Sequence, residues 1–156
     1  ARIDHLMGIK GKKSVDSIHK ELGHIMWEYV GMGRTEEGLK TALKLLKDIR
    51  KEFETNLFIP GSTEGVNIEL EKALRLNDFI TMGELIAYDA LNRNESCGGH
   101  FREEYQTEEG EAKRDDENYF YVSCWEYQGS DDVAPVLYKE PLVYEAIKVQ
   151  TRNYKS

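Results

Sequence analysis

The fold class is decided by residues 35–61, which read TEEGLKTALKLLKDIRKEFETNLFIPG. Apolar side chains recur there at steps of three and four residues, as on the buried face of a helix: Leu39, Ala42, Leu43, Leu46, Ile49, Phe53 and Leu57. Glu36 and Glu37 place acid in the first turn, where the positive end of the helix dipole favours it. Since proline cannot continue a helix, we expect an amphipathic helix that opens at Thr35 and ends before Pro60.

A similar helix is predicted upstream, over residues 15–30. Its apolar residues again follow helical spacing: Val15, Ile18, Leu22, Ile25, Met26, Tyr29 and Val30. Ser14 is a plausible N-cap, and Gly31 with Gly33 ends the pattern. These two helices predict a bundle.

The third helix is expected from Asn67 to Arg93, and it is apolar on two sides. The predicted core stripe consists of Leu70, Ala73, Leu74, Asn77, Ile80, Glu84 and Leu91. The second apolar face consists of Leu76, Phe79, Met82, Leu85, Ile86 and Tyr88. A helix with two apolar faces must touch more than its two bundle neighbours. The chain is therefore predicted to be mainly α, with a three-helix bundle over residues 1–93 that packs against something else.

The pattern changes after Arg93, where turn-forming and charged residues replace the helical period. The expected elements are a long loop (94–118), an aromatic strand (119–127), a turn (128–132), a returning strand (133–138) and an extended tail from Pro141, with 143–149 as a short strand. An isolated hairpin is only marginally stable in water. We therefore expect residues 94–156 to pack on the bundle as part of one structural domain.

The composition excludes several classes of protein. The net charge is -8 and the isoelectric point is near 5.1, which argues against a nucleic-acid partner because phosphate binding needs a basic face. Two cysteines make no disulfide framework and indicate a reducing compartment. No apolar run approaches the roughly 20 residues that span a bilayer, and no signal peptide is recognisable. A start at Ala1 fits a piece of a longer protein.

Most of the reactive side chains lie in residues 94–105, which read NESCGGHFREEY and are called the motif loop below. Cys97 and His100 have the spacing of half a zinc site, but a structural site normally needs a second close pair. A histidine beside Cys97 could also activate its thiol, although the neighbouring glutamates favour the neutral form. A third interpretation is structural, because Gly98 and Gly99 allow close backbone approach and Arg102 can bridge carboxylates or carbonyls.

Several ordered motifs then resemble the C-terminal region of the flavoprotein subunit of succinate dehydrogenase and fumarate reductase. Residues 25–32 (IMWEYVGM) are similar to the family's MWEHVG helix, 34–39 (RTEEGL) to RNEEGL, 67–74 (NIELEKAL) to NLEL…AL, 94–102 to ESRGAHxR, and 113–119 (KRDDENY) to RDDENW. Cys97 stands where most members have arginine, and Gly99 where they have alanine.

The resemblance implies a spectrin-repeat-like three-helix bundle without catalytic, cofactor-binding or metal-ligating residues of its own. In the intact subunit, upstream FAD-binding and capping domains would interconvert succinate and fumarate. The residues expected to contact the FAD domain are Ser96, Gly98, Gly99, His100 and Arg102. Further implied partners are the iron–sulfur subunit and the membrane anchor, which would place the protein in the cytoplasm, peripheral on the inner face of the cell membrane.

Three other hypotheses stay open at this point. The chain could be a stand-alone helical interaction domain, the equivalent domain of L-aspartate oxidase, which shares the bundle, or a thiol enzyme that uses Cys97. The exposed apolar positions predicted on the third helix also suggest self-association of the isolated chain.

Overall fold

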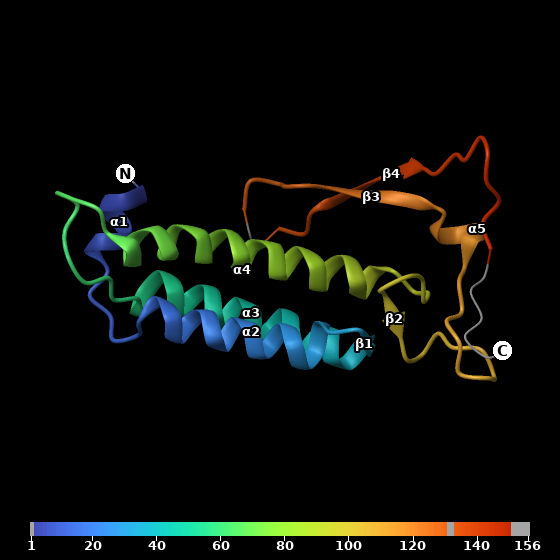
Figure 1. Cartoon of the computed structure of the whole chain (residues 1–156), viewed down its shortest axis with the longest axis horizontal. Helices are drawn as coiled ribbons and strands as arrows, with labels where there is room; N and C mark the ends of the chain where they lie inside the picture. The colour runs from blue at the N-terminus through green and yellow to red at the C-terminus, as the bar shows by residue number, and fades with distance from the viewer. Residues whose placement is uncertain (1, 131–132, 151–156) are drawn as a thin grey trace.

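The computed structural model describes residues 2–130 and 133–150. A short helix α1 (Arg2–Gly8) precedes three long helices, α2 (Val15–Val30), α3 (Glu36–Asn56) and α4 (Ile68–Asn92). The long helices lie side by side and alternate in direction, as the colour order shows (Figure 1). The predicted three-helix bundle is confirmed.

All three long helices start where the sequence predicts, and the side chain of the residue before each helix caps it. The Ser14 hydroxyl accepts the Ser17 N–H, and the Thr35 hydroxyl accepts the Gly38 N–H. The Asn67 side-chain oxygen accepts the N–H of Leu70, the third helical residue. Each cap satisfies one donor that the first turn of a helix leaves without an intrahelical partner.

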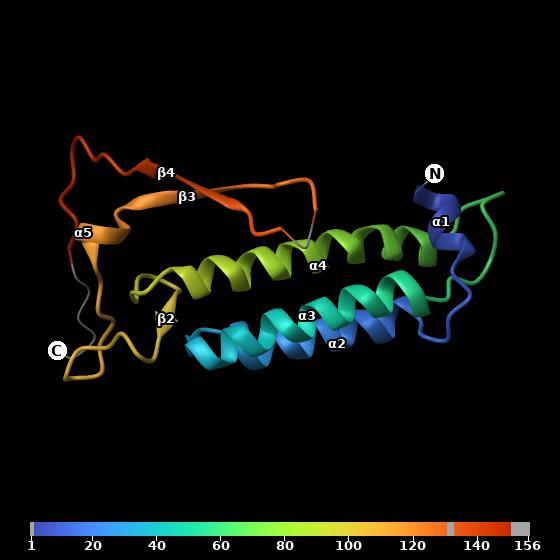
Figure 2. The same ribbon diagram turned by 180° about the vertical axis from the view of Figure 1, so that it is seen from behind.

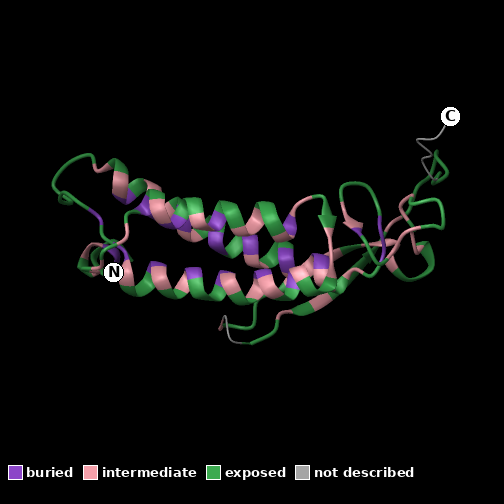
Figure 3. Cartoon of the chain, turned by 90° about the horizontal axis from the view of Figure 1, so that it is seen from below, coloured by how far each residue is buried: buried purple, intermediate pink, exposed green. Residues whose placement is uncertain are grey.

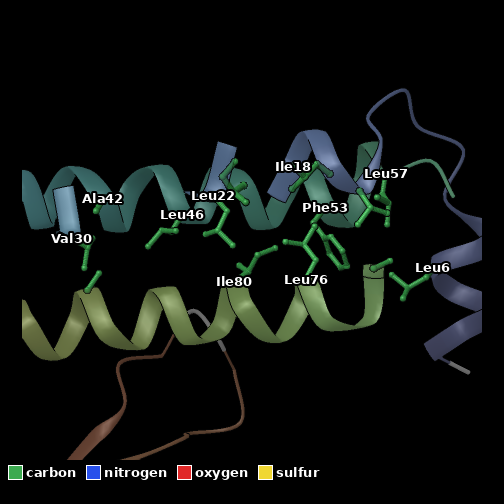
Figure 4. Packing of buried hydrophobic residues seen from close by; sticks show 14 of the residues in the cluster. Leu6, Ile18, Leu22, Val30, Ala42, Leu46, Phe53, Leu57, Leu76 and Ile80 are labelled. Atoms are coloured by element: carbon green, nitrogen blue, oxygen red, sulfur yellow. The ribbon is translucent and has the colours of Figure 1, made fainter. Parts of the chain in front are cut away.

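The core lies between the three helices and extends to Leu6 of α1 (Figures 3 and 4). On α2 and α3 it follows the predicted stripes. On α4 the buried positions are Leu70, Ala73, Leu76, Ile80, Gly83, Ala87 and Ala90. Leu76, which we expected on the second face, is 1% exposed, whereas the expected core residues Asn77 and Glu84 are half-buried.

The orientation of α4 that buries Leu76 has a packing cause, which is the close approach of α4 to α2. A Cβ atom added to Gly83 would lie 3.1 Å from Met26 Sδ, so the absence of a side chain lets the two helices come together. The helix turns its small residues, Gly83, Ala87 and Ala90, toward the core at this end. Glu84 is displaced to the edge, where it pairs with Arg50 of α3.

The remaining residues form short strands and a hairpin. Strands β1 (Gly33–Arg34) and β2 (Phe101–Arg102) pair in parallel, and a single helical turn α5 (Asp116–Tyr119) precedes β3 (Tyr121–Glu126) and β4 (Val136–Pro141). β3 and β4 pair antiparallel, from Tyr121 opposite Pro141 to Glu126 opposite Val136. The hairpin is confirmed, with both strands two or three residues later than predicted at their starts.

The expected strand at 143–149 is wrong, because these residues have no strand conformation. In the described part of the chain β4 pairs only with β3, so no third strand exists for them to extend. The loop prediction for 94–118 also missed β2 and α5.

The hairpin lies along the outer side of α4, as both views of the ribbon show (Figures 1 and 2). Trp125 Nε1 donates a hydrogen bond to Asp89 Oδ1 at 2.8 Å, and the Trp125 ring meets the Tyr88 ring edge-on at 5.0 Å. The second apolar face of α4 is therefore covered at Tyr88. Farther along the helix, Phe79 and Met82 stay exposed.

Candidate functional site

Arg102 is the most deeply placed charge of the motif loop, with no exposed surface. Its Nη1 donates to the carbonyl oxygens of Ala90 and Leu91, at 3.1 and 3.3 Å, and its Nε donates to Glu104 Oε2 at 3.0 Å. The two carbonyls belong to the last turn of α4, where a positive charge is favoured by the helix dipole. Nη2 is buried and has no hydrogen-bond partner among the described residues. Arg102 thus binds the C-terminal end of α4.

Ser96 closes the motif loop on itself. Its Oγ accepts the backbone N–H of Arg102 at 2.8 Å and donates to the Arg102 carbonyl oxygen at 3.1 Å. The Ser96 N–H donates to the carbonyl of Lys113. Ser96 has no exposed surface, so its polar groups serve contacts within the chain.

His100 connects two elements through both of its ring nitrogens. Arg34 Nη1 lies 2.8 Å from His100 Nδ1, and His100 Nε2 lies 2.9 Å from the Arg93 carbonyl oxygen. A guanidinium can only donate and a carbonyl can only accept, so Nδ1 is the acceptor and Nε2 carries the proton. Burial lowers the pKa of His100, and the charges of Arg34, Arg102 and Arg93 lower it further, against the opposing effect of the Arg93 carbonyl. The imidazole is therefore neutral.

Arg34 and Glu104 extend these contacts to the other two helices. Arg34 Nε donates to the carbonyl of Gly31, just past α2, and the Arg34 carbonyl accepts the N–H of Glu103. Glu104 accepts the N–H of Glu36 at the start of α3. Burial raises the pKa of Glu104, but hydrogen bonds from backbone N–H groups and from Arg102 outweigh it, so the pKa lies below its usual value. The motif loop and its partners therefore contact the same end of all three helices.

A second ion pair, Arg93 with Glu95, links the start of the hairpin to the C-terminal end of α4. Arg93 donates to Glu95 Oε1 and to the carbonyls of Tyr119 and Tyr121, at 2.9 to 3.0 Å. Glu95 is 3% exposed, and its Oε2 accepts the N–H of Asp115. Neither Arg93 nor Glu95 is among the interface residues expected from the sequence. Arg34 lies in the RTEEGL motif and Glu95 in the motif loop, but no local pattern predicts their partners.

The exposed part of the motif loop is a turn at residues 97–100. Cys97 and His100 exchange backbone hydrogen bonds of 2.8 and 3.0 Å, and Gly98 has φ +59°, a conformation that favours glycine. Cys97, Gly98 and Gly99 are exposed, whereas Ser96 and Arg102 are buried. Of the five predicted interface residues, only the two glycines are fully at the surface.

The geometry also bears on the zinc and thiol hypotheses. The turn brings Cys97 and His100 together, yet both ring nitrogens of His100 are bound to Arg34 and Arg93. Neither nitrogen is available to ligate a metal or to deprotonate the thiol. Across residues 2–130 and 133–150, no group of three or more His, Cys, Asp or Glu side chains could hold a metal ion, and no helix has the length and hydropathy needed to cross a bilayer.

Residues 19–154 match the sequence profile of the C-terminal region of fumarate reductase flavoproteins. The chain belongs to this family. The match includes α2 from His19 onward, and all of α3, α4, the motif loop and the hairpin.

Individual relatives include FAD-dependent oxidoreductases, fumarate reductase flavoprotein subunits and L-aspartate oxidases. An uncharacterized FAD-dependent oxidoreductase of Methanocaldococcus jannaschii is 31% identical over 66% of this chain and 18% of its own length. The fumarate reductase flavoprotein subunit of Proteus vulgaris is 31% identical over 73% of this chain and 18% of its own. A chloroplastic L-aspartate oxidase of Nicotiana tabacum is 37% identical over 56% of this chain and 13% of its own. The chain thus spans less than a fifth of the length of these relatives.

Among solved structures, a quinol-fumarate reductase with menaquinol matches with a TM-score of 0.77 and 24% identity. The match covers 94% of this chain and 24% of the other. At this identity the likeness shows a shared fold.

Proposed function

We propose that the chain is the helical C-terminal domain of a flavoprotein subunit that interconverts succinate and fumarate with FAD. In this proposal the flavin and the dicarboxylate bind to upstream FAD-binding and capping domains, and the residues of this chain supply no catalytic group. The observation that carries the proposal is the family match over residues 19–154. It is supported by relatives that are fumarate reductase flavoprotein subunits and FAD-dependent oxidoreductases.

The motif loop is the proposed contact with the upstream FAD domain, through Ser96, Gly98, Gly99, His100 and Arg102. Gly98 and Gly99 would form the contacting turn, since two exposed glycines allow another backbone to approach closely. Ser96, His100 and Arg102 would hold that turn in place, because their polar groups are bound inside the chain. The loop would thereby join the end of the bundle to the catalytic domains.

The same proposal extends to the other partners. The subunit would assemble with an iron–sulfur subunit and a membrane anchor, and would lie in the cytoplasm, peripheral on the inner face of the cell membrane. The shared fold with a quinol-fumarate reductase supports this arrangement. The acidic net charge of -8 favours protein partners over nucleic acid.

The test compares the 156-residue chain with the protein encoded by its whole reading frame. We expect the whole protein to purify with a flavin absorbance spectrum and to oxidise succinate with an artificial electron acceptor. The 156-residue chain, mixed with FAD and a dicarboxylate, should retain no flavin after gel filtration. A stoichiometric flavin complex of this chain alone, or succinate oxidation by it, would contradict the proposal.

A second candidate is the equivalent domain of an L-aspartate oxidase. It is favoured by the higher identity to the tobacco enzyme, 37% against 31% for the Proteus fumarate reductase subunit. The fumarate reductase match covers more of the chain, 73% against 56%, which favours the first candidate. Assays of the whole protein with succinate and with L-aspartate separate the two, because each candidate predicts turnover of only one of them.

A further inference from the structure

The motif loop has a buried base and an exposed turn. The base consists of Ser96 and Arg102, which have no exposed surface and are joined by two hydrogen bonds of Ser96 Oγ. Arg102 also donates to two carbonyls at the end of α4. The turn is residues 97–100, in which Cys97 and His100 exchange backbone hydrogen bonds. The turn can therefore move while the base of the loop stays attached to the bundle.

Two side-chain contacts join the turn to the rest of the chain, and both use the His100 ring. Nδ1 lies 2.8 Å from Arg34 Nη1, and Nε2 lies 2.9 Å from the Arg93 carbonyl oxygen. The remaining residues of the turn are exposed, and two of them are glycines. The closed position of the turn therefore depends on one ring that must accept at Nδ1 and donate at Nε2.

The charged groups that act on this ring are three arginines from three elements. They are Arg34 of β1, Arg93 at the end of α4 and Arg102 of β2. Nearby carboxylates act on these arginines: Asp89 on Arg34, Glu95 on Arg93 and Glu104 on Arg102. A second proton on the ring would add a fourth positive charge and direct an N–H at the Arg34 guanidinium. Since like charges in a partly buried site repel each other, the closed turn fits only the neutral ring.

We propose that His100 is a pH-sensitive latch, which closes the turn at residues 97–100 when neutral and releases it when protonated. On protonation the ring leaves the arginines for solvent, and Gly98 and Gly99, which directly precede it, give the backbone the freedom to rotate. The hydrogen bonds between Cys97 and His100 are then lost, whereas the base of the loop stays bound and the bundle stays folded. This opening needs no other domain, so it goes beyond the proposed function and does not depend on it.

The pH range of the latch follows from the two positions of the ring. In the open turn the ring is in solvent and has its ordinary pKa of about 6.5. In the closed turn burial lowers the pKa of His100, and the three arginines lower it further. The open turn therefore binds the proton first as the pH falls. Between the two pKa values, the equilibrium constant for opening rises about tenfold for each unit by which the pH falls.

Hydrogen exchange of the 156-residue chain, followed by NMR for each amide, measures this opening. Below about pH 6.5, the protection factors of the Cys97 and His100 amides should fall about tenfold per unit of pH, after correction for the intrinsic exchange rate. The NMR titration of the His100 ring should show the same pH dependence. The amides of Arg102, which donates to Ser96 Oγ, and of Ile80 in the core should keep their protection. These two amides separate opening of the turn from unfolding of the bundle.

A variant without a titrating ring tests the latch directly. In His100→Gln the amide can accept and donate but cannot gain a proton, so the protection of the Cys97 amide should not change with pH. His24→Gln is the matched control, because His24 is exposed on α2, and it should behave as the wild type. Three results would each overturn the proposal: the same pH dependence in His100→Gln, a wild-type turn whose protection is unchanged down to about pH 5, or an equal loss of protection at Ile80.

Discussion

At the scale of single residues, the motif loop is organised by buried donors whose acceptors lie on other elements. His100 is the clearest case, because its neutral ring accepts from Arg34 and donates to the Arg93 carbonyl. Protonation would leave Nδ1 with a hydrogen that points at a guanidinium. The charge would also lie near Arg102 and Arg93. The state of this one ring therefore affects how α2 and α4 are joined.

We expect the stability of the chain to depend on pH through His100. Its pKa in the folded chain lies below the ordinary value of 6.5, so the unfolded chain binds the proton first as the pH falls. The contribution of His100 is therefore complete above about pH 6.5 and is lost as the pH falls toward the folded pKa. Urea unfolding between pH 5 and 8 gives the free energy of unfolding as a function of pH. The slope of this dependence should be smaller for His100→Gln than for the wild type, because the glutamine amide can still accept and donate a hydrogen bond but does not titrate. Equal slopes for the two proteins would contradict this.

Arg102 gives a second prediction at this scale. Arg102→Met removes the donor to the Ala90 and Leu91 carbonyls and leaves Glu104 with one partner fewer. We expect the free energy of unfolding to fall by about 2–4 kcal/mol, because buried polar groups lose their partners. Arg75→Met is the control, since the exposed Arg75–Glu71 pair on α4 should contribute below about 1 kcal/mol. Denaturant titrations that show similar losses for both variants would argue against this role of Arg102.

At the scale of elements, the ends of the helices are joined by backbone contacts between distant segments. Residues just before α2 pair with the end of α3: the Gly11 N–H donates to Leu57, and the N–H groups of Lys12 and Lys13 donate to Asn56. At the opposite end, β1 and β2 pair the connection after α2 with the motif loop. These contacts join the ends of the helices to one another.

We expect Gly11→Ala to disrupt the first of these junctions. An added Cβ would lie 1.9 Å from the carbonyl carbon and oxygen of Asn56, and backbone atoms cannot move aside as a flexible side chain can. The loss of stability should reach about 1–3 kcal/mol or more. Gly8→Ala is the matched control, because a Cβ there meets nothing within 4 Å. The check is thermal unfolding, and an unchanged melting temperature for Gly11→Ala would show that the junction can relax.

At the scale of the whole molecule, residues after 93 close one end of the bundle. Arg102 contacts the end of α4, Glu104 the start of α3, and His100 reaches Arg34 beyond α2. The hairpin then returns along α4. These contacts support the prediction that the bundle and the segment 94–156 are one structural domain.

The division of the chain can be tested by truncation. If the two segments are one cooperative unit, the whole chain should unfold in a single calorimetric transition. A chain of residues 1–93 should melt at a lower temperature, because it lacks the three contacts that close the bundle. A bundle of residues 1–93 that is as stable as the whole chain, or two separate transitions in the whole chain, would show that the segments are independent.

The sequence by itself determined the features that depend on neighbours along the chain. Ser14, Thr35 and Asn67 cap helices whose apolar residues recur at helical spacing, because capping and amphipathicity are local properties. The hairpin could be predicted for the same reason, from its aromatic strand and turn. The ordered motifs also predicted the family, and the profile match confirms it.

Only the tertiary structure decided which faces and partners these elements have. The rotation of α4 that buries Leu76 depends on how closely Gly83 approaches Met26, which no single helix specifies. Arg34 and His100 are 66 positions apart, and Glu36 and Glu104 are 68 apart. Such pairs form because the bundle brings its ends together in space. The sequence marked the motif loop as important, and the fold assigned its buried residues to closing the bundle and its glycines to the surface.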